Sequence, residues 1–385
     1  MTGHRIVDLF AGAGGWEEGL LQLGRRALGI EFDPWAAATA RAAGHDRLEA
    51  DVAALDPAAF GPVDGLIGSP PCQAYSTAGK GLGRADKPRV IACAHELAAG
   101  NDSRAEHAGR CRDPRSLLTV EPLRWTLALK PRWVALEQVP AVLELWSEFA
   151  GLLAVHGYHV AAGVLSAEQY GVPQSRRRAF LIASLDGPVR LPAPTHRSYD
   201  PRHPHRVLED ERALSPWVSM GQALDRPEPA VTLTHSNTGH GTRPLGLART
   251  LDCPARTLDS TSGSWTIHPL VADADPHYDT RQGWGRPRSI DKPAPTISGS
   301  CPPIWITGSA ARAEIDPAPG GYRPRRGERV TVEQASVLQG FRPDYPWSGS
   351  RARQFRQIGN AVCPPLARQV LAAAMAPTNP SGGLG

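Results

Sequence analysis

Residues 4–24 read HRIVDLFAGAGGWEEGLLQLG, and this stretch defines a strand, a turn and a helix. The apolar run from Ile6 to Phe10 is typical of a buried strand, and small residues occupy positions 11–15. After Trp16, apolar residues recur at helical spacing. A glycine-rich turn between a strand and a helix often binds a nucleotide, but it also serves simple packing.

The next unit, RALGIEFDPWAAATARAAG at 26–44, repeats the same order. It predicts a strand from Ala27 to Ile30 and an alanine-rich helix that Asp33 and Pro34 begin. Further strands are expected before Cys72, at Trp133–Leu136 before Glu137, at Tyr158–Leu165 and at Ala179–Ser184, with helices over 115–130 and 141–156. Alternating strands and helices predict an α/β fold with a Rossmann-like, doubly wound parallel sheet, in which ligands bind at the carboxyl ends of the strands.

The length of 385 residues favours two domains. The hydrophobic fraction of 41% is that of a soluble globular protein, and the net charge of +4 permits a polyanionic partner without establishing one. Six cysteines lie far apart without CxxC pairs, and no apolar run resembles a signal peptide or a membrane span. We therefore expect a cytoplasmic protein with free thiols. Cys93, His95, His107 and Cys111 are irregularly spaced, so no metal site is expected.

Residues 187–329 are rich in proline, histidine, threonine and glycine, with weak periodicity. Three similar phrases, DRPEPAVTLT at 225, LDCPARTLDS at 251 and IDKPAPTISGS at 290, predict short strands in a small, mainly β domain. Helical patterns return at TVEQASVLQGF, where Thr331 is the expected N-cap, and again over about 361–375. The predicted organisation is a discontinuous catalytic domain, 1–186 and 330–377, with 187–329 inserted before the C-terminal helices and a disordered tail at 378–385.

Two acidic residues follow the first strands and suggest a cofactor. Glu31 ends the second predicted strand, where a carboxylate can accept hydrogen bonds from both hydroxyls of a ribose. Asp51, in EADVAAL, ends the next apolar stretch and can accept from an adenine amino group. Together with the glycine turn, these acids favour an adenosine-type cofactor.

Seven motifs resemble those of the DNA (cytosine-5) methyltransferases, in that family's order. They are DLFAGAGG, GIEFD, SPPCQAYS, ALEQV, QYGVPQSRRR, TVEQASVLQGF and QIGNAVCPPLA, and they span roughly residues 4–186 and 329–377. The resemblance implies S-adenosylmethionine as the cofactor and double-stranded DNA as the partner. It also implies that 187–329 is the target recognition domain, that a cognate restriction endonuclease acts separately, and that the enzyme is a monomer.

The resemblance assigns the chemistry to four residues. Cys72 is the expected nucleophile, and the stiff approach through Pro70 and Pro71 would fix its position. Its thiolate would add to C6 of a flipped-out cytosine and activate C5. Glu137 would engage N3 and the exocyclic amino group, while Arg178 and Arg176 hold the O2 side.

The same resemblance assigns the binding residues. The cofactor pocket would comprise Phe10 stacked on adenine, together with Ala11, Gly12, Gly14, Glu31, Phe32, Asp51, Val52, Pro71 and Asn360. The DNA contacts would come from Gln73, Ser76, Gln174 and Thr296.

Two features depart from the family pattern. Gln138 stands where the family usually has asparagine, and the segment from Lys80 to Asp113 is longer than usual, so an extra helix is expected in 81–112. Two alternatives stay open, an RNA cytosine-5 methyltransferase and a catalytically inactive DNA-binding regulator. An amino-methyltransferase is disfavoured, because an aromatic residue would then follow the two prolines where this chain has Cys72.

Overall fold

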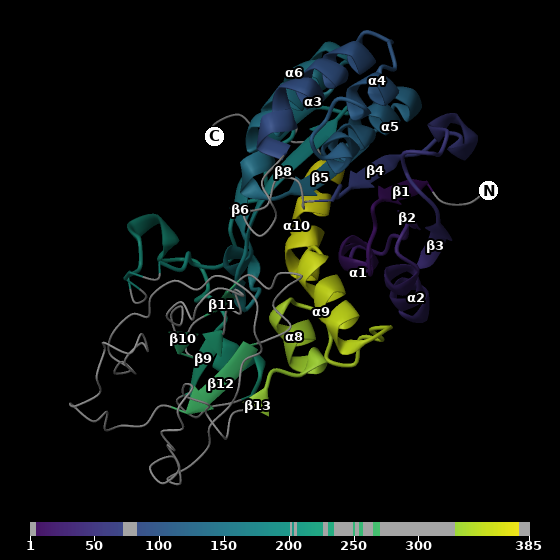
Figure 1. Cartoon of the computed structure of the whole chain (residues 1–385). Coiled ribbons are helices and arrows are strands. Elements are labelled where there is room, and N and C mark those ends of the chain that lie inside the picture. The colour runs from purple at the N-terminus through teal and green to yellow at the C-terminus, as the bar shows by residue number, and fades with distance from the viewer. Residues whose placement is uncertain are drawn as a thin grey trace.

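A computed structural model describes residues 5–71, 83–200, 202–203, 206–225, 230–234, 249–250, 254–256, 265–269 and 328–376. Within these residues the largest element is a seven-stranded sheet of order β3-β2-β1-β4-β5-β8-β6 (Figure 1). Its strands are β1 (Ile6–Leu9), β2 (Leu28–Glu31), β3 (Asp46–Glu49), β4 (Gly65–Gly68), β5 (Trp133–Gln138), β6 (His159–Ser166) and β8 (Arg177–Ser184). The predicted α/β class is confirmed.

The sheet is mixed, which corrects the expectation of an all-parallel sheet. Strands β1 to β5 are parallel, but β8 runs antiparallel to both β5 and β6. Only ten residues, 167–176, connect β6 to β8. A parallel pair needs a crossover of a dozen or more residues, so this short connection returns the chain in the opposite direction.

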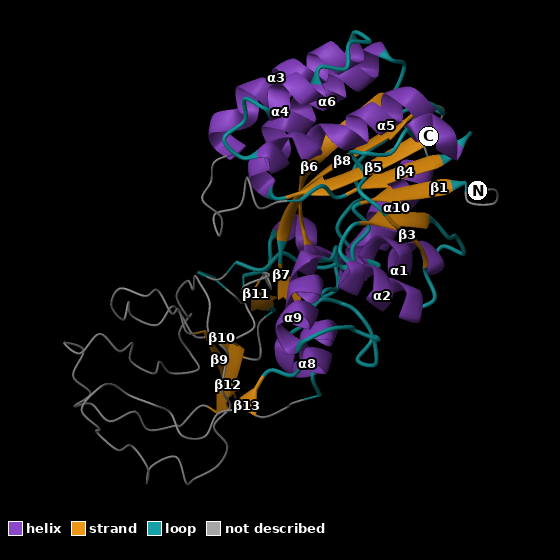
Figure 2. Cartoon of the chain, turned by 45° about the vertical axis from the view of Figure 1, so that its right-hand side comes forward, coloured by secondary structure: helices purple, strands orange, loops and turns teal. Residues whose placement is uncertain are grey.

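Helices cover both faces of the sheet (Figure 2). One layer contains α3 (Gly83–Ala98), α4 (Arg104–Ala108), α5 (Glu121–Leu129) and α6 (Leu143–Val155). The other contains α1 (Gly15–Leu21), α2 (Pro34–Ala42) and α10 (Pro364–Met375). The extended segment 81–112, where one extra helix was expected, contains the two helices α3 and α4. Short 3-10 helices are η1 (Pro57–Phe60), η2 (Pro114–Val120), η3 (Pro140–Val142), η4 (Ala167–Tyr170) and η5 (Glu209–Glu211).

Local signals placed several helix starts correctly. Asp33 accepts a hydrogen bond from the Trp35 amide at the start of α2. Thr331 forms a capping box with Gln334 at the start of α8 (Val332–Leu338). Two expectations were wrong in detail: 115–130 divides into η2 and α5, and the helix expected from about 361 begins at Pro364, after the separate helix α9 (Arg351–Asn360).

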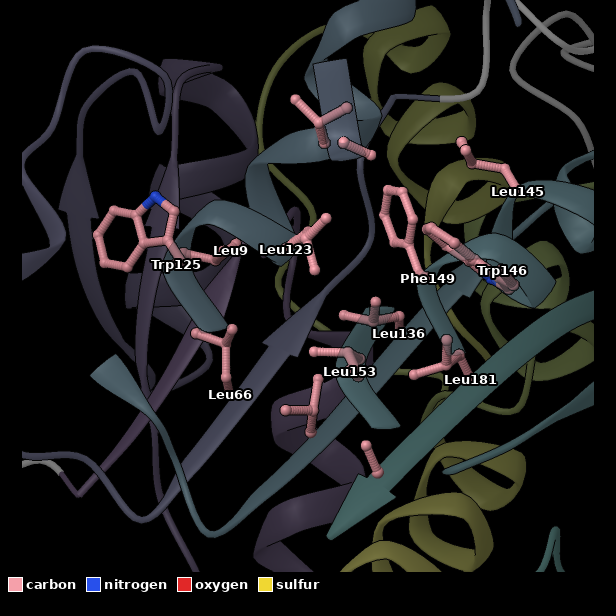
Figure 3. Close-up of a cluster of buried hydrophobic side chains, with 14 of the residues drawn as sticks. Leu9, Leu66, Leu123, Trp125, Leu136, Leu145, Trp146, Phe149, Leu153 and Leu181 are labelled. Atoms are coloured by element: carbon pink, nitrogen blue, oxygen red, sulfur yellow. The ribbon is translucent and has the colours of Figure 1, made fainter. Parts of the chain in front are cut away.

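Alternating strand residues pack against the two helical layers, because successive side chains of a strand point to opposite faces. Figure 3 shows Leu9, Leu66, Leu136 and Leu181 of four strands in one buried cluster that also contains Trp146 and Phe149 of α6. Ile6, Ile67, Phe180 and Ile182 pack on the other face, against α1 and α10. Burial of one such side chain contributes about 1.5–3 kcal/mol. The two packed faces hold the strand ends in fixed positions.

The described part of 187–329 contains short strands, as predicted. Among these residues, β9 (Ala230–Thr234), β10 (Arg249–Thr250), β12 (Trp265–Pro269) and β13 (Glu328–Arg329) form an antiparallel sheet of order β10-β9-β12-β13. Strand β9 belongs to the first of the three repeated phrases, and the phrase at 290 lies outside the described residues. Strand β11 (Ala255–Arg256) pairs with β7 (Gln174–Ser175). Because β7 lies in the connection between β6 and β8, this pair joins the region to the seven-stranded sheet.

A third hydrophobic cluster crosses the predicted domain boundary. Met220 of α7 (Met220–Ala223) and Ala255 pack with aromatic and aliphatic residues of 330–361, and Ala13 joins the same cluster. Helices α8 and α9 therefore contact both the glycine turn and the region that precedes them. The division into 1–186 with 330–377 and 187–329 stays a prediction.

Candidate active site

The glycine turn after β1 is held by the acid that ends β2. Phe10 and Gly12 both have φ of +58°, and Gly14 has φ of +110°, so the turn uses the left-handed region that favours glycine. The Glu31 carboxylate accepts hydrogen bonds from the Gly12 amide at 2.8 Å and from the Asp33 amide at 2.7 Å. Glu31 thereby fixes both the turn and the start of α2.

The surroundings of Glu31 suit an adenosine-type ligand. Burial raises the pKa of Glu31, although the two amide hydrogen bonds act in the opposite direction. Phe32, the next residue, is 73% exposed, and Phe10 on the neighbouring strand end is half-buried. A Cβ added at Gly12 would meet no atom within 4 Å, so there is open space above the turn. The structure thus brings Phe10, Gly12, Glu31 and Phe32 to one edge.

The second predicted acid, Asp51, lies two residues beyond β3, at the same edge. Its Oδ1 accepts a hydrogen bond from the Ala53 amide at 2.9 Å, and the side chain is otherwise exposed. Val52 is buried and its carbonyl accepts from Arg124 Nη2 at 3.0 Å. Because β3, β2 and β1 are adjacent and parallel, Asp51, Glu31 and the turn follow one another along the edge.

A buried charged cluster supports the turn from below, and the sequence analysis missed it. Arg47 of β3 forms an ion pair with Glu17 of α1, and its Nη2 donates to the Gly12 carbonyl at 3.1 Å. Asp8 of β1 lies beside this pair, fully buried. Burial raises the pKa of Asp8 well above its ordinary value, and the nearby charge of Glu17 raises it further. The ion pair of Arg47 and Glu17 is thus joined to the turn by the hydrogen bond from Arg47 to the Gly12 carbonyl.

The C-terminal part of the chain returns to the glycine turn. The Tyr345 hydroxyl donates to the Ala13 carbonyl at 2.6 Å. A Cβ at Gly15 would collide with the Val362 carbonyl, so the two segments touch through their backbones. Asn360 is exposed at the last position of α9, two residues before Val362. The predicted role of Asn360 in the cofactor pocket stays a prediction; the supporting contact of Tyr345 was not predicted.

Glu137 and Arg178 form an ion pair at the end of β5. Arg178 Nε lies 3.0 Å from Glu137 Oε1, and the side chains are 14% and 7% exposed. Glu137 pairs with Phe180 in the β5–β8 register. Arg178 lies two residues before Phe180, so its side chain is on the same face of the sheet as that of Glu137 and is its diagonal neighbour. The antiparallel direction of β8 is what brings its first residues to the carboxyl end of β5.

Two other predicted residues, Gln174 and Arg176 of the QYGVPQSRRR motif, are buried against the C-terminal part of the chain. Arg176 Nη1 donates to the Gly359 carbonyl at 2.8 Å. Gln174 Nε2 donates to the Leu338 carbonyl at 3.1 Å and to Gln339 Oε1 at 2.8 Å. These contacts fix the loop before β8. The predicted catalytic role of Arg176 and the predicted DNA contact of Gln174 stay predictions.

Gln138 fixes the approach to the predicted nucleophile. Its Nε2 donates to the Pro70 carbonyl at 2.7 Å, and its Oε1 accepts from the Val139 amide at 2.6 Å. One residue earlier, the Ser69 hydroxyl accepts from Trp16 Nε1 at 2.8 Å. The segment is therefore anchored up to Pro71, the last residue before Cys72. Four predicted site residues lie outside the described residues: Cys72, Gln73, Ser76 and Thr296.

Among the described residues, no group of three or more histidine, cysteine, aspartate or glutamate side chains is arranged to hold a metal ion. None of the helices described is long and apolar enough to cross a membrane.

The described residues form an α/β fold with a glycine turn that Glu31 holds and a mostly buried pair of Glu137 and Arg178. The sequence model of the C-5 cytosine-specific DNA methylase family matches residues 4–94 and 103–375. The chain therefore belongs to this family.

Curated relatives agree with that membership, and a solved structure shares the fold. The chain is 26% identical to the type II methyltransferase M1.HphI of Haemophilus parahaemolyticus, over 97% of this chain and 87% of the relative. It is also 26% identical to the type II methyltransferase M.DdeI of Desulfomicrobium norvegicum, over 95% and 87%. The S. pombe Dnmt2 methyltransferase shares the fold, with a TM-score of 0.54 and 14% identity over 97% of this chain and 98% of that one.

Proposed function

We propose that the protein is an S-adenosylmethionine-dependent DNA (cytosine-5) methyltransferase that modifies one cytosine within a specific duplex sequence. The observation that carries the proposal is the Glu137–Arg178 pair, which lies in the sheet beside the anchored Pro70–Pro71 segment that leads to Cys72. Membership of the C-5 cytosine-specific DNA methylase family and the type II methyltransferase relatives support it.

The cofactor site suits S-adenosylmethionine, which supplies an electrophilic methyl group. Glu31 would accept from the ribose hydroxyls and Asp51 from the adenine amino group. Phe10 and the exposed Phe32 offer aromatic faces for the adenine. Ala11, Gly14, Val52, Pro71 and Asn360 would complete the pocket. The open space above Gly12 and the exposed Asp51 carboxylate fit this ligand.

Cytosine C5 is a weak nucleophile, and the Cys72 thiolate would overcome this. Addition of the sulfur to C6 would break the C5–C6 double bond and place its electron pair on C5, which would take the methyl group as the bond from that methyl to the sulfonium sulfur breaks and S-adenosylhomocysteine is left. Loss of the C5 proton restores the double bond and expels the thiolate. The rigid segment up to Pro71 would help to hold the thiol close to C6 during the addition.

Glu137 and Arg178 would make this addition possible. Negative charge accumulates on the ring as sulfur adds, and a carboxyl group that donates a hydrogen bond to N3 stabilises it. Arg178 holds the carboxyl group through the 3.0 Å contact and would place a permanent positive charge on the O2 side of the base. Both side chains are mostly buried, so this charge is weakly screened.

The target base must leave the duplex to reach these groups, at a cost of about a few kcal/mol. Gln73, Ser76 and Gln174 would contact the strand near the flipped nucleotide. We assign sequence choice to 187–329, with Thr296 contacting the backbone, since base edges in the grooves specify sequence while phosphate contacts position the protein. A separate cognate endonuclease and a monomeric enzyme complete the proposal.

The direct test is a covalent trap. Wild-type enzyme, S-adenosylmethionine and a duplex that carries 5-fluorocytosine should give an adduct on a denaturing gel, because fluorine cannot leave as the proton does. Cys72→Ala should give no adduct and no methyl transfer. Cys111→Ala, a change at a half-buried free cysteine of the same chain, should retain both.

Several outcomes would contradict the proposal. Methyl transfer by Cys72→Ala would exclude the covalent mechanism, and transfer to folded RNA without transfer to duplex DNA would identify the RNA alternative. Bisulfite sequencing of DNA from a host that expresses the protein reports the modified sequence. An absence of methylation in both assays would favour the inactive DNA-binding regulator.

A further inference from the structure

The α3–α4 hairpin includes a segment that the family does not share. The family model matches residues up to 94 and again from 103, so 95–102 lie outside it. These eight residues form the end of α3 and the connection to α4. Arg104, the first residue of α4, follows this segment after the N-cap residue Ser103.

Arg104 joins the connection to the body of the enzyme. Its Nε and Nη2 donate to the two carboxylate oxygens of Asp102, both at 2.8 Å. Its Nη1 donates to Glu121 Oε1 at 2.6 Å and to the Ala53 carbonyl at 3.3 Å. The hydrogen bonds from Asp102 and Glu121 raise the pKa of Arg104, so the guanidinium is charged at every accessible pH. Arg104 thus links three segments: the connection at Asp102, helix α5 at Glu121 and the loop at Ala53.

Glu121 carries a second arginine that reaches the same loop. The Glu121 side chain is 3% exposed, and its Oε2 accepts from Arg124 Nε at 2.7 Å. Arg124 Nη2 donates to the carbonyls of Val52, at 3.0 Å, and Leu55, at 3.1 Å. Two arginines on one buried carboxylate therefore bind the carbonyls of residues 52, 53 and 55. Both arginines lie in the part of the chain that the family model matches, but Arg104 also binds Asp102, the last residue of the additional segment.

The loop that these arginines bind carries Asp51. The Ala53 amide donates to Asp51 Oδ1 at 2.9 Å, while the Ala53 carbonyl accepts from Arg104. The amide of Ala53 is therefore held by the Asp51 carboxylate, and the carbonyl of Ala53 is held by the Arg104 guanidinium. Without Arg104, the carbonyl of Ala53 would lose this partner, and the loop would keep the hydrogen bond between the Ala53 amide and Asp51 and the two contacts of Arg124.

We propose that Arg104 is a positioning residue that fixes Asp51 for cofactor binding, and that the additional α3–α4 connection thereby sets the affinity for S-adenosylmethionine. The inference rests on the proposed function of Asp51. Arg104 acts through the loop and does not touch the ligand, so its loss weakens cofactor binding and leaves the chemical step unchanged.

The test measures cofactor affinity separately from catalysis. Arg104→Ala should weaken S-adenosylmethionine binding by roughly 3- to 30-fold in calorimetry, the range expected for coupled neighbouring groups. At saturating cofactor, kcat and the KM for DNA should stay within about twofold. Arg104→Lys should give an intermediate affinity, because one ammonium group keeps the charge beside Glu121 but cannot bridge Asp102 and Ala53 together.

The matched control is Arg110→Ala, which removes an exposed ion pair with Glu106 on the same hairpin and should change nothing. Hydrogen exchange provides a readout of the loop itself. The amides of 51–55 should exchange faster in Arg104→Ala than in wild type and should be unchanged in Arg110→Ala.

A double-mutant cycle with Asp51→Ala decides the outcome even where Arg104→Ala lowers stability. If Arg104 acts through Asp51, its removal has no further effect on cofactor affinity in the Asp51→Ala background. Equal losses in both backgrounds, or unchanged affinity in Arg104→Ala, would overturn the inference. Failure of the wild type to bind S-adenosylmethionine would instead reject the proposed function, because this measurement needs no methyl transfer.

Discussion

The two halves of the predicted site are built in different ways. On the cofactor half, at β1 to β3, carboxylates accept hydrogen bonds from loop amides, as Glu31 does from Gly12 and Asp51 from Ala53. On the substrate half, at β5 and β8, the central contact joins two side chains, Glu137 and Arg178.

Strand direction explains this difference. Parallel strands all release their loops at the same edge, so an acid at one strand end meets the backbone of the neighbouring loop. An antiparallel strand enters the sheet at that edge, and its first side chains lie directly beside the end of its partner. The cofactor half therefore depends on how its loops are held, and the substrate half depends on the register of β8.

The largest effect is expected for a substitution that disrupts only the substrate half of the site. Arg178→Ala leaves Glu137 mostly buried without its ion-pair partner and removes charge stabilisation from the ring, so kcat should fall by about 10²- to 10⁴-fold. Calorimetry should show S-adenosylmethionine affinity within about twofold of wild type. The control is Arg177→Ala, the exposed neighbour on β8. Equal losses in the two variants would mean that the Glu137 contact is unimportant.

A second substitution tests the support beneath the cofactor half. Arg47→Met leaves Glu17 buried without its ion-pair partner, and removal of one partner from a buried pair costs about 3–5 kcal/mol of stability. Urea unfolding measures this loss. Arg41→Ala, which breaks an exposed pair with Glu49, should cost about 0–1 kcal/mol. A small loss in Arg47→Met would show that the buried cluster does not stabilise the fold.

A third substitution sharpens the comparison by acting on the cofactor half directly. Glu31→Ala removes the acceptor for the Gly12 and Asp33 amides, so S-adenosylmethionine affinity should fall by about 1–3 kcal/mol. At saturating cofactor, kcat should change far less than in Arg178→Ala. Glu49→Ala, at the exposed end of β3, is the control. Unchanged affinity in Glu31→Ala, measured by calorimetry, would falsify the pocket assignment.

The smallest effect concerns the pH dependence of stability. Asp8 faces Glu17, Arg47 and Glu31, and its folded-state pKa is raised by burial. The folded protein therefore binds a proton that the unfolded chain has released, and stability falls as pH rises from the unfolded pKa, about 3.9, through the raised folded value.

Asp8→Asn removes this proton linkage. The free energy of unfolding of the variant, relative to wild type, should rise by about 1.4 kcal/mol per pH unit within that window. Parallel urea titrations at several pH values measure the difference and cancel the contributions of the other carboxylates. A difference that stays constant with pH would show that Asp8 is ionised in the folded protein.

Local sequence determined much of this protein. The glycine turn, the acids at the ends of β2 and β3, the Asp33 cap and the Thr331 capping box all depend on residues close together in the chain. Hydrophobic periodicity placed the strands, and seven ordered motifs defined the family, because each motif combines several residue types at fixed spacing. These features need no knowledge of how distant segments meet.

Tertiary structure decided the contacts that join those segments. The antiparallel direction of β8, which brings Arg178 to Glu137, follows from the short connection after β6 and from the order of strands in the sheet. Arg47 meets Glu17 and Gly12 because β3 lies two strands from β1, and Tyr345 reaches Ala13 across 332 positions of sequence. Such contacts carry no local signal, because they depend on strand order and side-chain packing, and both are fixed only when the whole sheet forms.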